Sequence, residues 1–266
     1  MKNNDSIKKD WNSMAEAYET FNNSEDSYSY NIEWPCVKQL LPELGKKTVV
    51  DLGCGTGIFT FLLEGFLPEQ IIGIDLSEEM LNIAKVKAGK MSSKAEFICY
   101  DASKCKEVIR MPVDFIFSST TSHYIKNIGE LFKNVAASLK NGGECVFSII
   151  HPLYSAMYPI EHGDTFPDDE EWKVRYLDKS VRAYIQPWLE YNDDYEDHLS
   201  ISYHHTFSDY INAIIDAGLL IEEIREPMAP EKWKTMQPDR YDSFMETPVY
   251  MIIKMKKPAA KHIPVC

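Results

Sequence analysis

The stretch that decides the fold of this 266-residue chain reads Val49-Val50-Asp51-Leu52-Gly53-Cys54-Gly55-Thr56-Gly57. A short, mainly apolar run ends here, three glycines follow at alternate positions, and an apolar helical pattern begins at Ile58. Glycine adopts positive φ without steric cost and lets backbone N–H groups approach a ligand closely. The start of the next helix offers partial positive charge to an anionic group such as a carboxylate. The stretch therefore predicts a strand, a ligand-binding turn and a helix.

The spacing of the glycines argues against a dinucleotide ligand. A dinucleotide fingerprint has the form G-x-G-x-x-G, whereas here Gly57 comes one position early and Ile58 follows it. Asp51, just before the turn, adds a carboxylate that a pyrophosphate would repel. A glycine turn can also serve only to pack a helix against a strand, so the turn alone does not establish a ligand site.

The segments around this turn alternate between short apolar runs and amphipathic helical patterns. We expect strands at Thr48–Leu52, Ile71–Asp75, Glu96–Tyr100, Val113–Ser118, Glu144–Ile150, Leu219–Arg225 and Pro248–Lys254. We expect helices at Ser6–Phe21, Tyr28–Leu41, Ile58–Gly65, Ser77–Lys87, Ile128–Lys140 and Ser208–Ala217. Ser77 is a good N-cap for its helix, and Asn141-Gly142-Gly143 is expected to end the helix before the fifth strand. The alternation predicts an α/β fold with a doubly wound, Rossmann-like sheet.

Acidic residues stand at or near the ends of the first three expected strands: Asp51, Asp75 and Asp101. The carboxyl ends of parallel strands meet at one edge of the sheet, where open α/β sheets bind their ligands. An acid after the second strand can accept hydrogen bonds from ribose hydroxyls, and one after the third can accept from an adenine amino group. Each alone could be an ordinary strand-end cap, but together, beside a glycine turn, they favour a nucleoside ligand.

The composition restricts the partners of the chain. Lys and Arg number 28 and Asp and Glu 41, which gives a formal net charge of −13. Such a surface repels phosphate backbones, so we expect a small molecule rather than a nucleic acid. The six cysteines include no C-x-x-C pair and no zinc-type spacing, so we expect reduced thiols, no metal and a cytoplasmic protein. The polar start and the lack of a long apolar stretch predict no signal peptide and no membrane segment.

The chain resembles the class I S-adenosylmethionine-dependent methyltransferases, and among them the bacterial enzymes that act on small molecules. The resemblance is carried by Asp51–Gly57, Gly73–Leu81, Leu139–Gly143, the entry helix Trp11–Tyr18 and the segment Thr206–Leu219. It implies a seven-stranded sheet in the order 3-2-1-4-5-7-6 with the last strand antiparallel. It also implies S-adenosylmethionine as the methyl donor and S-adenosylhomocysteine as the product. One departure is His205, where relatives often carry an arginine.

By this resemblance, Gly53 and Gly55 approach the methionine part of the cofactor, Asp75 holds the ribose, and Asp101 and Ala102 meet the adenine. Ser118 and Ser119 border the sulfonium, and Tyr18 closes over the cofactor. The remaining residues assigned to the cofactor site are Asp51, Gly57, Leu76 and Met80.

Methyl transfer is an in-line displacement, so positioning and exclusion of water supply most of the acceleration. A general base is needed only if the acceptor arrives protonated, and His123 and His151 are the catalytic candidates because imidazole titrates near neutral pH. His123 could equally be a packing histidine, whereas His151 directly follows the fifth strand. The residues expected to meet the acceptor are Tyr28, Tyr154, His204 and His205.

Residues 151–205 carry ten aromatic, twelve acidic and four basic side chains, and show no clear helical or strand periodicity. They could form a mobile lid that stacks on a planar or cationic acceptor, or the aromatic side chains could form a satellite core under a solvated acidic face. We favour the lid for the aromatic residues and the solvated face for the acids. The expected organisation is one domain over residues 1–257, with a helical cap at 1–45, the lid insertion and a loose tail at 258–266.

The sequence therefore predicts a methyltransferase for a small-molecule oxygen or nitrogen nucleophile. The alternative is a protein of this fold that binds S-adenosylmethionine without methyl transfer, as a cyclase or a non-catalytic subunit. An NAD-dependent oxidoreductase fits less well, because of the glycine spacing and the lack of a separate substrate domain. The acceptor molecule and the oligomeric state stay open.

Overall fold

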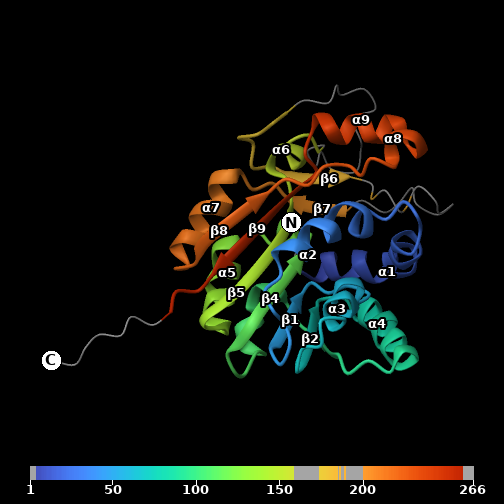
Figure 1. Ribbon diagram of the computed structural model, residues 1–266. Coiled ribbons are helices and arrows are strands. Elements are labelled where there is room, and N and C mark those ends of the chain that lie inside the picture. Colours follow the sequence, from blue (N-terminus) through green and yellow to red (C-terminus); the bar gives the residue numbers. More distant parts are fainter. Residues whose placement is uncertain (1–3, 159–173, 185, 187–188, 190–199, 260–266) are drawn as a thin grey trace.

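A computed structural model describes residues 4–158, 174–184, 186, 189 and 200–259 of the chain. Its centre is a seven-stranded sheet with the strand order β3-β2-β1-β4-β5-β9-β8 (Figure 1). The first five strands of this order are parallel, and β9 runs antiparallel to both β5 and β8. The main strands are β1 (Thr48–Leu52), β2 (Gln70–Asp75), β3 (Glu96–Cys99), β4 (Val113–Ser119), β5 (Leu139–Ile150), β8 (Leu220–Arg225) and β9 (Tyr250–Lys256). The predicted strand order is confirmed.

The larger helices are α1 (Asn4–Asn22), α2 (Trp34–Leu40), α3 (Ile58–Glu64), α4 (Glu78–Met91), α5 (Ile128–Ser138), α7 (Phe207–Asp216) and α9 (Pro238–Glu246). Shorter helical turns are η1 (Ser29–Glu33), η2 (Ala102–Glu107), η3 (Ser122–Tyr124), α6 (Pro152–Ser155) and α8 (Trp233–Met236). In the described part of the chain no helix is both long and apolar enough to cross a membrane.

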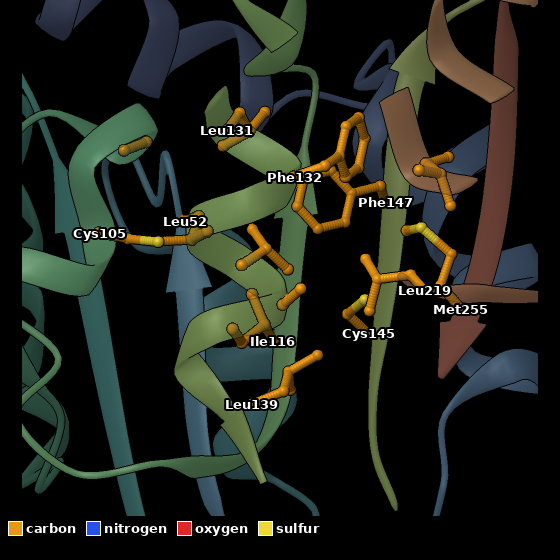
Figure 2. Close-up of a cluster of buried hydrophobic side chains, with 14 of the residues drawn as sticks. Leu52, Cys105, Ile116, Leu131, Phe132, Leu139, Cys145, Phe147, Leu219 and Met255 are labelled. Carbon is orange, nitrogen blue, oxygen red and sulfur yellow. The ribbon is translucent and has the colours of Figure 1, made fainter. Parts of the chain in front are cut away.

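Alternating side chains of the sheet build two cores. Val50, Leu52 and Phe147 point to the face covered by η2, α5 and α7, where Phe132 of α5 packs on Phe147 with ring centroids 5.2 Å apart (Figure 2). Val49 and Phe117 point to the opposite face, covered by α2 and α3. Because neighbouring residues of a strand face opposite ways, Asp51 shares the face of Val49 and meets α3.

The end of the sheet where β4 and β5 finish is covered by a separate group of elements: α6, α8, α9 and a two-stranded antiparallel sheet of β6 (Val181–Tyr184) and β7 (Ser200–Tyr203) (Figure 1). Trp233 and Phe244 anchor α8 and α9 in a third buried cluster that includes Tyr250 of β9. The carboxyl edge of the sheet thus lies under a cap built largely from residues after β5.

Three sequence-based expectations differ from the structure. The helix expected to reach Lys140 ends at Ser138, and β5 begins at once, because Asn141-Gly142-Gly143 forms an irregularity inside the strand instead of a helix stop. The pairing of β4 shifts there from Val113 with Leu139 to Phe115 with Glu144, and Gly142 takes the required positive φ of 78°.

The second difference lies in the expected helix Tyr28–Leu41, which begins as the π-helical turn η1. Pro35 has no N–H to donate four residues back, and the Trp34 N–H bonds instead to Ser29 O, five residues back. The third difference lies in residues 151–205. Their described parts include α6, β6 and β7 rather than irregular chain alone. Residues 159–173, 185, 187–188 and 190–199 of the expected lid, and 260–266 of the expected tail, lie outside the described residues.

Candidate active site

The glycine turn after β1 is held against the end of β2 by backbone hydrogen bonds. The N–H groups of Gly53 and Cys54 both donate to Ile74 O, at 2.7 and 3.1 Å. Gly53 has a φ of 72°, and a Cβ on it would lie 1.8 Å from Thr121 Oγ1, so only glycine fits. Gly57 has a φ of 84°, and a Cβ there would lie 2.7 Å from the Phe61 ring. The turn is therefore tight because both conformation and space exclude a side chain.

Asp75, at the end of β2, fixes this turn from the side. Its Oδ2 accepts a hydrogen bond from the Gly55 N–H at 2.8 Å, and its Oδ1 accepts from the Ser77 N–H at 2.8 Å. Burial raises the pKa of the Asp75 carboxyl, while these backbone donors oppose the rise. Next to it, Ser77 caps α4 by accepting from the Met80 N–H at 3.1 Å and donates to Asn12 Oδ1 of α1 at 2.7 Å. The turn, α4 and the N-terminal helix are thus joined at one point.

One cavity of about 710 Å³ opens on this edge, within the usual size of a small-molecule site. Of the residues predicted to bind the cofactor, the following line it: Tyr18, Gly53, Gly55, Asp75, Leu76, Met80, Asp101, Ala102 and Ser119. Asp101 lies at the start of η2, where its Oδ1 accepts from the Ser103 N–H at 2.8 Å. The ends of β1, β2, β3 and β4 therefore converge on a single cavity, as the strand-end acids indicated.

Three residues predicted for the cofactor lie away from the lining. Asp51 points to the α3 face, where Thr60 Oγ1 donates to its Oδ2 at 2.6 Å, and burial raises the pKa of Asp51 to about 7. Ser118 is buried and donates through Oγ to Leu52 O at 2.8 Å. Gly57 packs against Phe61 beneath the turn. Side chains alternate along a strand, so Asp51 and Ser118 point away from the cavity, whereas Ser119 faces it.

Of the four histidines in the described ranges, only His123 lines the cavity. Burial, with a smaller effect from His205, lowers the pKa of His123 to about 3, so the ring is neutral near pH 7. His151 instead caps α6 by accepting from the Leu153 N–H at 3.1 Å, and its Nε2 lies 2.9 Å from Glu226 Oε1. The expectation that His151 faces the reacting groups is therefore not met, because its ring turns outward from the end of β5.

His204 and His205 also lie outside the lining and act as internal hydrogen-bonding groups. His204 is buried between Ser155 Oγ and Tyr176 O, 2.8 Å from each, and His205 donates from Nε2 to Ile125 O at 2.9 Å. Both tie the segment before α7 to neighbouring loops. Their expected contact with an acceptor is not supported by this placement.

The half of the cavity next to β4, β5 and β9 is aromatic. The predicted residues Tyr28 and Tyr154 line it, and Tyr158 stacks on Tyr184 with centroids 4.1 Å apart. Tyr158 and Tyr184 come from the aromatic segment 151–205, whereas the lining residues that the sequence did not indicate include Glu33, Tyr124, Gln186, Arg240, Phe244 and Tyr250. Three of them, Arg240, Phe244 and Tyr250, come from α9 and the start of β9, whose distance along the chain from the glycine turn hides the contact. Of these residues, only Glu33 stands out in the sequence, because it is an acid in the otherwise apolar run Ile32-Glu33-Trp34-Pro35.

One strained backbone position lies where β4 meets this aromatic half. Thr120, directly after Ser119, has a φ of 44°, which is unfavourable for a β-branched residue. Its N–H bonds to Ser148 O at 2.8 Å, and Thr121 Oγ1 donates to Ser119 O at 2.8 Å. The strand end is therefore held rigidly at the middle of the cavity, between its acidic and aromatic halves.

Comparison with known proteins points to methyltransferases. Residues 49–143 match the family model described as a methyltransferase domain. An uncharacterized protein of Haemophilus influenzae is 29% identical over 93% of this chain and 96% of its own length. Malonyl-[acyl-carrier protein] O-methyltransferase 2 of Ilyobacter polytropus is 31% identical over 55% of this chain, and that match covers only 48% of the relative. An S-adenosylmethionine-dependent methyltransferase of Mesorhizobium loti has a solved structure with a TM-score of 0.66 and 27% identity, covering 85% of this chain and 97% of that one.

Proposed function

The chain belongs to the class I S-adenosylmethionine-dependent methyltransferases, and we propose that it methylates an oxygen or nitrogen atom of a small molecule. The proposal rests on one observation: the glycine turn, Asp75 and Asp101 line the same cavity as a group of aromatic side chains. A site for a donor and a site for an acceptor then lie in one enclosed space. Methyl transfer needs this arrangement, because the two reactants must be aligned away from water.

The residues present fit the proposed donor. Gly55 presents backbone to the cavity beneath Tyr18, and Asp75 and Asp101 supply half-buried acceptors of the kind that ribose hydroxyls and an adenine amino group need. S-adenosylmethionine, when bound, supplies an electrophilic methyl group. The protein's part is to hold the nucleoside with these acids, to cover it with Tyr18 and to exclude water with the cap over the sheet edge. This last role is the one we proposed for the segment 151–205, of which Tyr154, Tyr158, Tyr184 and Gln186 line the cavity.

The choice of a small acceptor rests on charge and enclosure. A net charge of −13 disfavours nucleic acids and anionic membrane surfaces, and the aromatic lining suits a compact, planar or cationic molecule. We expect no metal requirement. In the described ranges, no group of three or more His, Cys, Asp or Glu side chains is placed to hold a metal ion.

Transfer of radiolabelled methyl groups tests the proposal. The protein is incubated with methyl-labelled S-adenosylmethionine and a cell extract that is afterwards separated into small-molecule, protein and nucleic-acid fractions. We expect label in the small-molecule fraction, and the same amount when a chelator is present. Tight binding of S-adenosylhomocysteine without label in any fraction would favour a binding protein or cyclase and would refute methyl transfer.

A further inference from the structure

A buried glutamate lies in the cavity at a point that the donor-binding residues do not occupy. Glu33 is the last residue of the π-helical turn η1, is only 1% exposed, and lines the cavity. The turn exists because Pro35 interrupts α-helical hydrogen bonding, and it rotates the chain just before α2 begins. π-turns inside helices occur frequently at functional sites, since they redirect a side chain at a cost in backbone regularity.

The Glu33 carboxyl has few partners inside the protein. Its partners are serine hydroxyls: Ser119 Oγ donates to its Oε1 at 2.7 Å, and Ser29 and Ser148 lie close enough to act on it. Among the described residues no Lys, Arg or His forms an ion pair with it. Burial raises the pKa of Glu33, and the serines near it only partly oppose the rise. A carboxylate has two oxygens that can each accept more than one hydrogen bond, and burying it unpaired is costly. Because it has no counter-charge among the described residues, the carboxylate can still accept a hydrogen bond from a ligand in the cavity.

The position of Glu33 separates it from the nucleoside site. Its partner Ser119 ends β4, which lies between β1 of the glycine turn and β5 of the aromatic half. Its charge in turn acts on two nearby phenols, those of Tyr18 from α1 and Tyr250 from β9. Burial raises the pKa of both phenols, so both stay neutral near pH 7. Glu33 is thus the acidic group in this part of the cavity.

We propose that Glu33 binds the nucleophilic group of the acceptor, a hydroxyl or an amine, and takes up the proton that this group loses. This inference rests on the proposed function and narrows its substrate class. The X–H bond breaks, its proton passes to a Glu33 oxygen, and its electron pair forms the new X–CH₃ bond. The electron pair of the S–CH₃ bond stays on sulfur, and Glu33 later releases the proton to solvent.

The same reasoning disfavours a carboxylic acid as acceptor. A carboxylate acceptor has no proton to give up, and it would place a second negative charge beside a buried one, which is unfavourable. The relative from Ilyobacter polytropus is named as an O-methyltransferase of malonyl-[acyl-carrier protein]. We infer that this chain differs from such an enzyme in the chemical class of its acceptor.

The test combines Glu33→Gln with the chemical stability of the labelled product. Glutamine keeps the shape and can still accept from Ser119, but it cannot take up a proton. Glu223→Gln is the matched control, since Glu223 is an exposed acid on β8 that pairs with Arg225. Labelled small molecules from the extract experiment are treated with base, which hydrolyses methyl esters to volatile methanol and leaves methyl ethers and methylamines intact.

We expect base-stable label from the wild-type protein, and at least ~100-fold less of it from Glu33→Gln, the lower bound of a general-base contribution. The remaining activity of Glu33→Gln should lose the rise with pH that Glu33 ionisation gives the wild type. Calorimetry should show S-adenosylhomocysteine bound within about threefold of wild type, and the melting temperature at pH 8 should be equal or higher, because an unpaired buried charge is removed.

Four results would overturn the inference. Base-labile label would mean a carboxylate acceptor, and undiminished labelling with an unchanged pH profile would exclude Glu33 as the base. A lower melting temperature together with weaker S-adenosylhomocysteine binding would make Glu33 a structural residue, and Ser119→Ala should then show the same loss. If the wild type binds S-adenosylhomocysteine and labels nothing, methyl transfer itself fails, and the inference fails with it.

Discussion

Replacing Asp75 by alanine should weaken cofactor binding and loosen the glycine turn at the same time. The carboxylate accepts two backbone hydrogen bonds, from Gly55 and Ser77, each 2.8 Å long. Alanine leaves both N–H groups without their charged acceptor and removes the oxygens proposed to meet the ribose hydroxyls. A hydrogen bond to a charged group contributes about 1.5–3 kcal/mol, so loss of one such contact to the ligand lowers affinity by roughly 10- to 150-fold.

Two measurements separate the parts of this effect. Calorimetry with S-adenosylhomocysteine reports the affinity, and thermal unfolding of the free protein reports the loss of the two backbone contacts. Asp75→Asn keeps one oxygen acceptor and should fall between alanine and the wild type in both. Asp242→Ala, which removes an exposed acid on α9 outside the cavity, should change neither. Unchanged S-adenosylhomocysteine affinity in Asp75→Ala would remove Asp75 from the ligand site and refute the assignment of the cavity's acidic half.

The other predictions concern the turn, the buried acid and the histidine. Gly53→Ala should abolish S-adenosylhomocysteine binding, because its Cβ would meet Thr121 at 1.8 Å. Gly142→Ala has a similar φ but open space around it, so it should cost only about 1 kcal/mol of stability. Equal losses of stability in urea unfolding would show that backbone conformation, and not space for the side chain, is decisive. Burial raises the pKa of Asp51 to about 7, so the native state holds this proton more tightly than the unfolded state does. The stability that the proton contributes is fully present below pH ~4 and is lost as the pH rises through about 7. Asp51→Asn should therefore gain stability relative to wild type as the pH rises from about 4 to 7, by at most ~1.4 kcal/mol per pH unit. Parallel stability profiles of the two proteins would contradict the raised pKa of the buried Asp51. His151→Asn should turn over as the wild type does, since the ring faces Glu226 rather than the cavity. A large fall in labelled product would show that His151 does take part in the reaction.

The sequence by itself determined the sheet and its ligand edge. Glycines at alternate positions after a buried strand allow few conformations, and the alternation of apolar runs with amphipathic helices leaves a doubly wound sheet as the simple solution. The acids after the second and third strands must then lie beside the turn, because parallel strands end at one edge. Asp75 and Asp101 line the cavity as this reasoning required, and the predicted strand order was found.

What only the tertiary structure decided is which side chains face the ligand and what covers them. Strand alternation turns Asp51 and Ser118 away and Ser119 inward, a choice that depends on the register of single residues. Much of the aromatic half comes from α9, β6 and β9, more than a hundred residues from the glycine turn, and no local pattern records which of their side chains reach the cavity. Glu33 reaches the cavity only because Pro35 distorts the helix before it and Ser119 ends the strand beside it. Local hydrogen bonding and hydrophobic periodicity fix the elements of this protein, but the chemistry of its acceptor site arises from packing between distant segments.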